Sequence, residues 1–320
     1  MISVITTTYN YSQYIKEAVQ SILNQSFKQF EYLIIDDGST DETEVLVNQF
    51  KDQRIKYYKL QHIGRSAALN FAVRKAKFDI IALMDADDIA HPQRLEKEIA
   101  TLKKRNQLIF CNTAYFKNKN IKYVLNSPSN SIELKSKILL HGHLNNSSVL
   151  FYKNYLVENL GYDESLIAYE DYDLWLRLLL KSEFIIISEP HHFVRLHEKS
   201  LTTSNQSKLK QTLYFIQEKY FSNLLPLITT NKTQQIKLMA WREFFYGKKV
   251  FARIYWRKLN LSDFNLKISI AYLLSFLADL LLDMIKNNRL RLRIEFVFNI
   301  SQVNKNIQSE LIRIRKSFKA

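Results

Sequence analysis

The sequence predicts an α/β fold in which a Rossmann-like, mostly parallel sheet is flanked by helices and followed by a C-terminal helical region. Three observations lead to this prediction. Apolar, strand-like runs alternate with segments of helical spacing through the first half of the chain. Acidic residues follow several of the predicted strands, and the composition becomes basic and mainly helical near residue 205. We therefore expect two regions, residues 1–204 and 205–320.

The elements of the first half follow from the spacing of apolar residues. Residues 2–7 are a β-branched run, typical of a strand buried on both faces. Residues 14–23 repeat apolar side chains at helical spacing. Ser39 and Glu42 match a capping box, which predicts a helix directly after them. By the same criteria we expect strands at 30–35, 54–60, 79–84 and 108–112, and helices at 66–76 and from Pro92 to about Arg105.

Residues 113–204 are less regular. We expect strands at 149–152 and 184–187 and a helix at 170–181. Because strands alternate with helices, a mostly parallel sheet with helices on both faces is favoured. Beyond residue 205 the chain is expected to be mainly helical, and this boundary rests on composition alone.

Charge is distributed unevenly along the 320 residues, whose formal net charge is +15. Residues 205–320 hold 21 Lys and Arg against 7 Asp and Glu, a net of +14, so residues 1–204 are nearly neutral. Such a basic region favours an anionic partner surface, with a solvated helical face as the alternative. The region is also rich in Leu, Ile and Phe and carries no nucleic-acid recognition motif, which fits internal packing or an anionic membrane better than nucleic acid.

The single cysteine, Cys111, excludes an intrachain disulfide and fits a reducing compartment. The N-terminus lacks the basic segment of a secretory signal and leads directly into a predicted strand. We therefore expect a cytoplasmic protein, peripheral at the inner face of the cytoplasmic membrane if the basic region binds lipid.

Candidate ligand-binding residues gather at the ends of the predicted strands. In open parallel sheets, ligands bind beyond the carboxyl ends of the strands. Those ends carry Thr-Tyr-Asn at 8–10, Asp-Asp-Gly-Ser at 36–39 and Asp-Ala-Asp-Asp at 85–88. No glycine-rich phosphate loop follows the first strand, which argues against a nicotinamide dehydrogenase or a P-loop enzyme.

Asp85, Asp87 and Asp88 indicate a site for a divalent cation. Adjacent carboxylates repel one another unless a cation or hydrogen bonds compensate. Mg²⁺ and Mn²⁺ prefer such oxygen ligands and typically bridge them to phosphate oxygens. The D-x-D pattern is weak by itself, since a second one occurs at Asp171 and Asp173. The alternative for the first is a capped loop that leads into the next helix.

Three further motifs have a structural alternative beside the functional one. Asp36 and Asp37 suit a turn that precedes a helix, although two adjacent carboxylates exceed what a turn needs. Glu170 and Asp171 open a predicted helix, where acidic side chains are favoured by the helix dipole. His197 lies in a predicted loop, where a lone histidine is as readily structural as a ligand.

Taken as an ordered set, these motifs resemble those of family 2 glycosyltransferases, which have the GT-A fold. The resemblance covers roughly residues 1–204. Chance would hardly supply all six elements in this order, which are Thr8-Tyr-Asn10, Asp36-Asp-Gly-Ser-Thr-Asp41, Gly64-Arg-Ser-Ala-Ala-Leu-Asn70, Asp85-Ala-Asp-Asp88, Glu170-Asp171 and Arg195-Leu-His-Glu-Lys-Ser200.

The resemblance implies a role for each candidate residue. Thr8 and Asp37 would contact the nucleotide base, with Tyr9 at its border, and Arg65 would lie near the donor. Asp85 would bind the ribose or a metal-bound water, Asp87 would ligate the metal, and His197 would lie near the diphosphate or the metal. Asp171 would be the catalytic base, with Glu170 beside it. Two positions depart from the family pattern. The family often has proline where this sequence has Thr8, and arginine where it has Leu69. Both departures concern the donor side.

The resemblance further implies an inverting transfer of one sugar from a nucleotide-sugar, UDP being the expected nucleotide and Mn²⁺ or Mg²⁺ the cofactor. The acceptor would be a hydroxyl of a saccharide or lipid-linked saccharide in cell-surface polysaccharide or glycolipid assembly. Processive synthases of the family resemble one another in a Gln-x-x-Arg-Trp motif that this sequence lacks, which favours single addition. The alternative is a non-catalytic nucleotide-sugar or carbohydrate-binding module on the same fold.

Residues 266–285 are the most apolar stretch of the C-terminal region, but Asp279 and Asp283 argue against a membrane span. Polar residues recur there at three- and four-residue spacing, which predicts an apolar helix with one narrow polar stripe. Such a helix packs in a helical subdomain, pairs with a partner chain as in a homo-oligomer, or lies in a membrane interface. Alternating arginines at 289–293 suit lipid headgroups but also fit a strand.

Overall fold

The computed structural model describes residues 1–142, 144–197, 206–276 and 305–318. It divides into two units. Unit 1 comprises residues 1–129, 144–204 and 301–320, and unit 2 comprises residues 130–143 and 205–300. The C-terminal segment thus belongs to the same unit as the N-terminal strands. The boundary that composition predicts at residue 205 stays a prediction.

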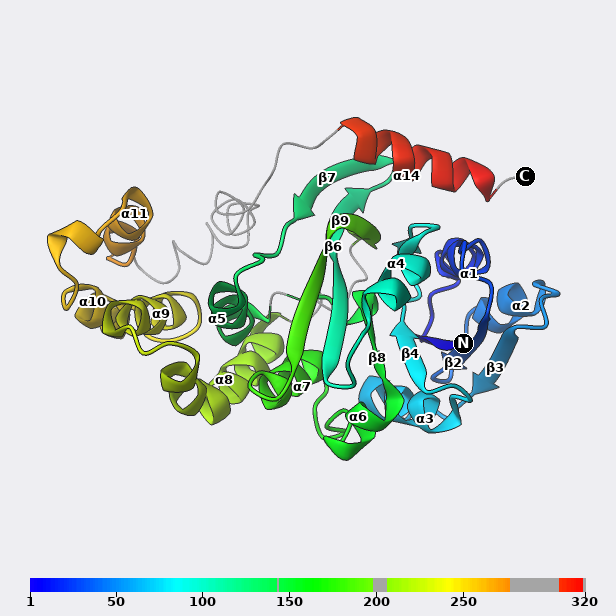
Figure 1. The fold of residues 1–320 in the computed structure, drawn as a ribbon, viewed down its shortest axis with the longest axis horizontal. Helices are drawn as coiled ribbons and strands as arrows, with labels where there is room; N and C mark the ends of the chain where they lie inside the picture. Colours follow the sequence, from blue (N-terminus) through cyan, green and yellow to red (C-terminus); the bar gives the residue numbers. More distant parts are fainter. Residues whose placement is uncertain (143, 198–205, 277–304, 319–320) are drawn as a thin grey trace. The chain divides into compact units, whose positions relative to one another are not determined.

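Unit 1 is built on a mixed sheet that has nine strands in the described part of the chain (Figure 1). The strands run in the order β3-β2-β1-β4-β8-β6-β9-β5, and β7 pairs with β6. They are β1 (Ile2–Thr8), β2 (Phe30–Asp36), β3 (Ile55–Lys59), β4 (Ile80–Leu83), β5 (Ile89–Ala90), β6 (Gln107–Lys117), β7 (Asn120–Leu125), β8 (Val149–Tyr152) and β9 (Glu183–Arg195).

Only part of this sheet is parallel. β3, β2, β1 and β4 run parallel to one another, as the alternation of strands and helices predicts. β8 lies antiparallel to both β4 and β6, and it ends the parallel part. Beyond it, β6 and β9 are parallel, whereas β5 and β7 each pair in antiparallel fashion. The carboxyl ends of β1, β2 and β4 therefore share one edge of the sheet, where ligands bind in such folds.

Helices cover both faces of the central parallel strands, so β1 and β2 are largely buried, whereas β3 at the edge is partly exposed. All side chains of β1 are buried. Val4 and Ile34 pack with Val19 of α1 on one face, and the other face contacts α3 (Figure 1). The described helices of unit 1 are α1 (Ile15–Leu23), α2 (Thr43–Asn48), α3 (Arg65–Lys75), α4 (Arg94–Thr101), α6 (Lys153–Glu158), α7 (Glu170–Leu178) and α14 (Lys305–Ser317), with a 3₁₀ turn η1 (Asn146–Ser148).

Several elements differ in length from the prediction. β6 and β9 are longer than the apolar runs that mark them, because each pairs with the other from Gln107↔Glu183 to Phe116↔Arg195. α4 ends at Thr101 because Leu102 is extended, with φ −69° and ψ 114°. Pairing and backbone conformation of this kind depend on tertiary neighbours, so local periodicity does not reveal them.

The capping box predicted at Ser39 is wrong. α2 begins at Thr43, and its N-cap position is Glu42, with no side-chain cap. Ser39 instead belongs to the turn after β2, where its N–H donates to Asp36 Oδ1 at 2.7 Å. The N–H of Thr43 is satisfied by Asp41 Oδ1 at 3.0 Å. A nearer carboxylate has therefore taken over the role that the pattern assigns to Ser39.

Unit 2 is helical in its described part, as predicted for the C-terminal region. Its elements are α5 (Ser131–His141), α8 (Gln206–Ile228), α9 (Lys232–Phe245), α10 (Lys249–Trp256), η2 (Leu261–Asp263) and α11 (Leu266–Leu274). Phe244 and Trp256 form the centre of a core to which α11 adds Ile268 and Ala271. No helix in the described ranges is both long and apolar enough to cross a membrane.

The segment predicted as one striped apolar helix is described only up to residue 276. α11 accounts for its first nine residues. Asp279, Asp283 and the arginines at 289–293 lie outside the described residues, so the choice among packed, paired and interfacial helix stays open for that part.

Candidate functional site

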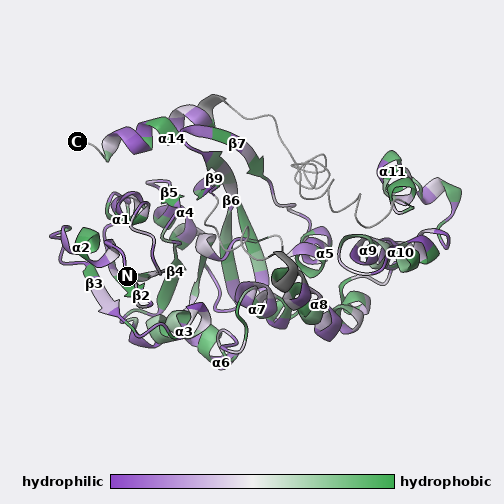
Figure 2. Cartoon of the chain, turned by 180° about the vertical axis from the view of Figure 1, so that it is seen from behind, coloured by the Kyte–Doolittle hydropathy of each residue, from purple (hydrophilic) through white to green (hydrophobic). Residues whose placement is uncertain are grey.

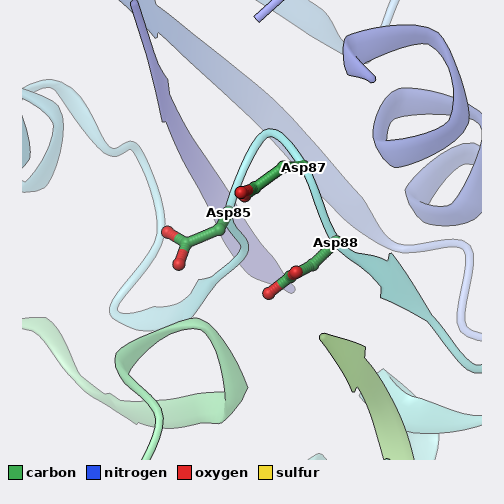
Figure 3. Close-up of side chains that lie close together, drawn as sticks. All are labelled: Asp85, Asp87 and Asp88. Carbon is green, nitrogen blue, oxygen red and sulfur yellow. The ribbon is translucent and has the colours of Figure 1, made fainter. Parts of the chain in front are cut away.

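The predicted aspartate cluster lies where β4 leaves the sheet (Figure 3). One ligand oxygen each of Asp85, Asp87 and Asp88 lies within 4.8 Å of the others. β4 is held between β1 and β8, and the buried guanidinium of Arg94 donates to the carbonyl of Leu83 at 2.8 Å. The loop therefore leaves a rigid strand end, which brings three carboxylates together despite their repulsion.

The side chain of Asp88 holds the aspartate loop, residues 85–88, against the protein interior. Its side chain is buried, and it accepts hydrogen bonds from the Arg195 N–H at 3.0 Å and from Ser147 Oγ at 3.2 Å. His192 Nε2 lies 2.9 Å from the same carboxylate. Burial, with the nearby charge of Asp85, raises the pKa of Asp88 to about 7. Since its oxygens are used within the protein, Asp88 is the least open of the three to a ligand.

His197 meets Asp87 at the end of β9. Its Nε2 lies 2.8 Å from Asp87 Oδ2, and the ring packs against Tyr14 with centroids 4.6 Å apart. His197 Nδ1 is buried without a hydrogen-bond partner among the residues that the structure describes. The imidazole of His197 and the carboxylate of Asp87 are thus within hydrogen-bond distance of each other beside the aspartate loop.

Arg65 joins the aspartate loop to the acidic start of α7. It is the first residue of α3, after Gly64, whose φ of 92° favours glycine. Its Nη2 donates to Asp85 Oδ1 at 2.6 Å and its Nε to Glu170 Oε1 at 2.7 Å. Because a guanidinium presents several donors in one plane, it can hold both carboxylates at once.

Asp171 lies beside this ion pair at the start of α7. Its Oδ1 accepts the N–H of Tyr172 at 2.8 Å. Burial, with the charge of Glu170 as the next cause, raises the pKa of Asp171 to about 7. Asp173, the other acid of the second D-x-D pattern, pairs with Arg177 at 2.7 Å and is buried, so the two acids do not form a second metal cluster.

The residues expected near the nucleotide lie together at the ends of β1 and β2. Asp37 N–H donates to the carbonyl of Thr8 at 2.8 Å, and Thr8 Oγ1 is buried without a partner in the described part of the chain. The Asp37 carboxylate accepts the N–H groups of Ile63 and Gly64 at 2.7 and 3.0 Å. In this structure Asp37 therefore shapes the loop that leads to Arg65.

Tyr9 is exposed and stacks on His62, with ring centroids 4.1 Å apart. This pair forms a flat, partly open surface beside Asp37, and His62 Nδ1 lies 3.2 Å from the Asp37 carboxylate. Flat aromatic surfaces suit the stacking of a planar ligand group. Sequence reasoning did not single out His62, whose only signal is its place just before Gly64.

Comparison with known proteins shows which family this chain resembles. Residues 3–160 match the family model described as glycosyl transferase family 2. The uncharacterized glycosyltransferase MJ1057 of Methanocaldococcus jannaschii is 30% identical over 260 residues, which cover 78% of this chain and 87% of that protein. The O-antigen biosynthesis glycosyltransferase WbnJ of Escherichia coli is 32% identical over 234 residues, covering 68% of this chain and 88% of WbnJ.

The chain belongs to glycosyltransferase family 2. Solved structures show that this glycosyltransferase has the GT-A-type fold that its motifs imply. S. aureus TarS residues 1–349, solved with UDP-GlcNAc, aligns over 86% of this chain and 79% of TarS with a TM-score of 0.60 and 17% identity. The mannosyltransferase PcManGT from Pyrobaculum calidifontis, solved with GDP-Man and Mn²⁺, aligns over 99% and 86% with a TM-score of 0.59 and 16% identity.

The structure also adds residues to the site that the motifs of this glycosyltransferase did not assign. Arg195 contacts the aspartate loop through both its backbone and its side chain. Tyr11 is partly buried, and desolvation together with the charge of Asp87 raises its pKa. Ser147 and His192 support Asp88 from η1 and β9. Only Arg195 had a signal in the sequence, since it stands two residues before His197.

The Arg65 bridge leads to a prediction about stability. Arg65→Met should lower the free energy of unfolding by about 1–3 kcal/mol, because Glu170 would become a buried carboxylate without its cation. Arg74→Met, at an exposed position of α3, is the matched control and should change stability by less than about 0.5 kcal/mol. Urea denaturation would measure both.

Adding Glu170→Gln to Arg65→Met should recover part of the loss, since the unpaired charge is then removed. If the free energy of unfolding of the double variant falls below that of Arg65→Met by the full effect of Glu170→Gln alone, the two changes are independent. That result would contradict the Arg65–Glu170 ion pair as a source of stability.

Proposed function

We propose that this glycosyltransferase moves a single sugar from a nucleotide-sugar to a hydroxyl acceptor, with a divalent metal ion and with inversion at the anomeric carbon. The observation that carries the proposal is the chain of contacts from His197 and Asp87 through Asp85 and Arg65 to the acids of α7. A cluster that suits a cation beside a carboxylate that suits a base supports this proposal.

The proposed metal is Mn²⁺ or Mg²⁺, held by Asp87 with His197 beside it. Asp85 and Asp87 are partly exposed, so their oxygens are open to a ligand, whereas Asp88 is buried. When bound, the cation would stabilise the negative charge that develops on the leaving diphosphate. The solved PcManGT complex contains Mn²⁺, which supports the same choice here.

The proposed base is Asp171, with Glu170 next to it. The acceptor hydroxyl must lose a proton as it attacks, and a carboxylate whose pKa is about 7 can accept it near neutral pH. Arg65 holds Glu170 in an ion pair, which leaves Asp171 as the less constrained of the two acids. One base and one in-line attack invert the anomeric centre, so an α-linked donor would give a β-linkage.

We propose UDP as the nucleotide, bound by Thr8, Tyr9 and Asp37, with Arg65 near the donor and Asp85 on the ribose or a metal-bound water. The stacked Tyr9–His62 surface supports a planar group at this place, and the Thr8 hydroxyl, which has no hydrogen-bond partner among the described residues, supports a polar one. TarS was solved with a UDP-sugar and PcManGT with a GDP-sugar, so a nucleotide-sugar donor is common to both. WbnJ is described as an O-antigen enzyme, which supports a saccharide or lipid-linked saccharide acceptor at the cell surface.

We further propose that unit 2 holds the enzyme at an anionic membrane surface, as a peripheral protein on the cytoplasmic face. The support is a surface of α10, η2 and α11 on which large apolar side chains are exposed. This α10–α11 surface comprises Val250, Phe251, Ile254, Leu261, Leu266, Ile270, Leu273 and Phe276.

Helix geometry places these side chains away from the unit's own core. α10 buries Ala252 and Trp256, so Val250 and Ile254 lie on its opposite side. α11 buries Ile268 and Ala271 and turns the stripe Leu266, Ile270 and Leu273 to solvent, and Figure 2 shows α11 as mainly hydrophobic. Arg257, directly after α10, donates to Tyr272 Oη of α11 at 3.1 Å, which joins the end of α10 to α11.

Charge favours a lipid leaflet as the occupant of this surface. Residues 248–276 contain six Lys and Arg and one acid, Asp263, which is itself paired with Lys237 at 3.1 Å. Apolar side chains flanked by cationic ones match an interface of acyl chains and anionic headgroups. Each basic side chain near such a leaflet contributes about 1 kcal/mol, which salt screens.

The metal assignment predicts the effect of Asp87→Asn. This change removes a charged ligand and keeps the side-chain shape, so Mn²⁺ binding and donor hydrolysis should both collapse while the fold survives. Isothermal titration with Mn²⁺, with and without UDP, would measure the loss. Asp79→Asn, the same change at an exposed position before β4, is the control and should bind Mn²⁺ normally. An Asp87→Asn enzyme with unaltered Mn²⁺ dependence would refute the ligand.

The base assignment predicts a pH dependence. Because Asp171 acts only when ionised and its pKa is about 7, kcat/KM should rise as pH increases through about 7. Asp171→Asn should keep donor affinity and lose transfer by about 10²–10⁴-fold, without that rise. Loss of donor binding to the same degree would place Asp171 in the donor site instead. Binding without any turnover in the wild type would favour the non-catalytic alternative.

The membrane proposal predicts the outcome of liposome flotation. The protein should float with vesicles that contain phosphatidylglycerol, weakly with pure phosphatidylcholine, and partly dissociate in high salt. Ile254→Ser with Leu273→Ser should remove the salt-resistant part of binding. Val45→Ser with Val157→Ser, two exposed positions of unit 1, are the matched control. Equal flotation with neutral and anionic vesicles would refute the electrostatic contribution. A protein that does not float and is dimeric in solution would assign the α10–α11 surface to a second copy of the chain.

A further inference from the structure

The C-terminal helix α14 belongs to unit 1, and the proposed function gives it no role. In Figure 1 it lies beside β7, more than 170 residues after that strand in the chain. Gln308 fastens it there, since its Oε1 accepts the N–H of Ile121 at 2.6 Å and its Nε2 donates to the Lys119 carbonyl at 2.7 Å. Leu311 and Ile314 are buried. α14 is therefore a packed element of unit 1.

α14 also packs against the strand that directly follows the aspartate loop. Ile89 of β5 lies in one buried cluster with Leu311 and Ile314. At the next turn of the chain, His91 Nε2 lies 3.2 Å from Glu310 Oε1. The chain that leaves the loop is thus held by α14 at two adjacent points.

A chain of ion pairs connects α14 to the other end of the loop. Arg315 Nε and Nη2 donate to Glu17 Oε1 of α1 at 2.9 and 2.7 Å. Glu17 Oε2 accepts Arg195 Nη2 at 2.6 Å. Glu17 is therefore shared by two guanidinium groups, one from the C-terminal helix and one from the end of β9.

Arg195 brings this chain to the aspartates themselves. Its Nε donates to the carbonyl of Asp87 at 2.7 Å, and its N–H donates to Asp88 Oδ1 at 3.0 Å. The guanidinium lies over the rings of Tyr14 and Phe116, 4.8 and 4.7 Å from their centroids. Arg195 thus holds the loop by its backbone and leaves the Asp87 carboxylate to His197.

The geometry points to α14 as a strut that sets the position of the aspartate loop. Arg315, acting through Glu17, keeps the Arg195 guanidinium on the Asp87 carbonyl. A guanidinium released from Glu17 would be free to turn to the Asp85 and Asp87 carboxylates, where it would compete with a divalent cation. Arg315 and Glu17 are positioning residues, and the consequence for metal binding rests on the proposed function.

The test compares Arg315→Gln and Glu17→Gln with Arg313→Gln, a change of the same kind at an exposed position of α14. Calorimetric titration would measure the affinity for Mn²⁺ alone, and hydrogen exchange would measure amide protection at residues 85–91. Both test variants should weaken Mn²⁺ binding by about 3–30-fold and lower the protection of this segment. The Arg313 control should leave both unchanged.

Two further comparisons separate positioning from general destabilisation. Arg315→Lys keeps the charge, so its Mn²⁺ affinity should lie between those of Arg315→Gln and the wild type. A general loss of stability would lower amide protection in the central strands β1 and β2 as well as at residues 85–91. The double variant should be no weaker than the weaker single one, because both changes break the same chain.

The outcomes distinguish this inference from the proposed function. If the wild type binds Mn²⁺ and the Arg315 and Glu17 variants bind it equally well with unchanged protection, the strut is refuted. If the wild type binds no Mn²⁺, the proposed metal site is refuted. The hydrogen-exchange data alone then test whether α14 holds the aspartate loop. Lower protection at residues 85–91 in the test variants then still supports the strut, and unchanged protection refutes it.

Discussion

The repulsion among carboxylates at the end of β4 is the constraint on which the rest of the site depends. Asp85, Asp87 and Asp88 have oxygens within 4.8 Å of one another, and Glu170 and Asp171 lie close by through Arg65. Like charges at such separations cost free energy unless opposite charges or hydrogen-bond donors face them. Each of these carboxylates accordingly faces a hydrogen-bond donor or a cationic side chain, and Asp85 and Glu170 share Arg65. Asp85 and Asp87 are the most exposed of the three loop aspartates, and they suit a divalent cation as further compensation.

The compensating groups come from separate parts of the chain, which ties the folding of unit 1 to the assembly of the site. Arg65 comes from the start of α3, His197 and Arg195 from the end of β9, and Arg315 from the C-terminal helix. The mixed sheet makes this possible, because β9 runs beside β6 and pairs with β5 directly after the aspartate loop. A purely parallel sheet would give the loop no such antiparallel partner.

Local patterns in the sequence were sufficient to predict the four parallel strands of the first half of the chain. β1, β2, β3 and β4 occur where the sequence predicts them. For β1, β2 and β4 the reason is that a strand buried on both faces must be largely apolar. Local patterns fail where contacts with distant segments determine the ends of an element. β6 and β9 extend beyond their apolar runs because each supplies the other's hydrogen bonds, and Ser39 lost its capping role to Asp41, two residues away. The position of α14 on unit 1 had no local signal at all.

The sequence by itself determined the family and the chemical character of the site, because aspartates after strands and the ordered motifs around them are local features. It led to Asp85, Asp87, Glu170, Asp171 and His197 as candidates, and the structure brings them to one edge of the sheet. Only the tertiary structure decided which of them contact one another, that Arg65 bridges two of them, and that Asp88 is an anchor with a raised pKa. Burial and charge pairing depend on segments distant in sequence, so no local pattern can encode them.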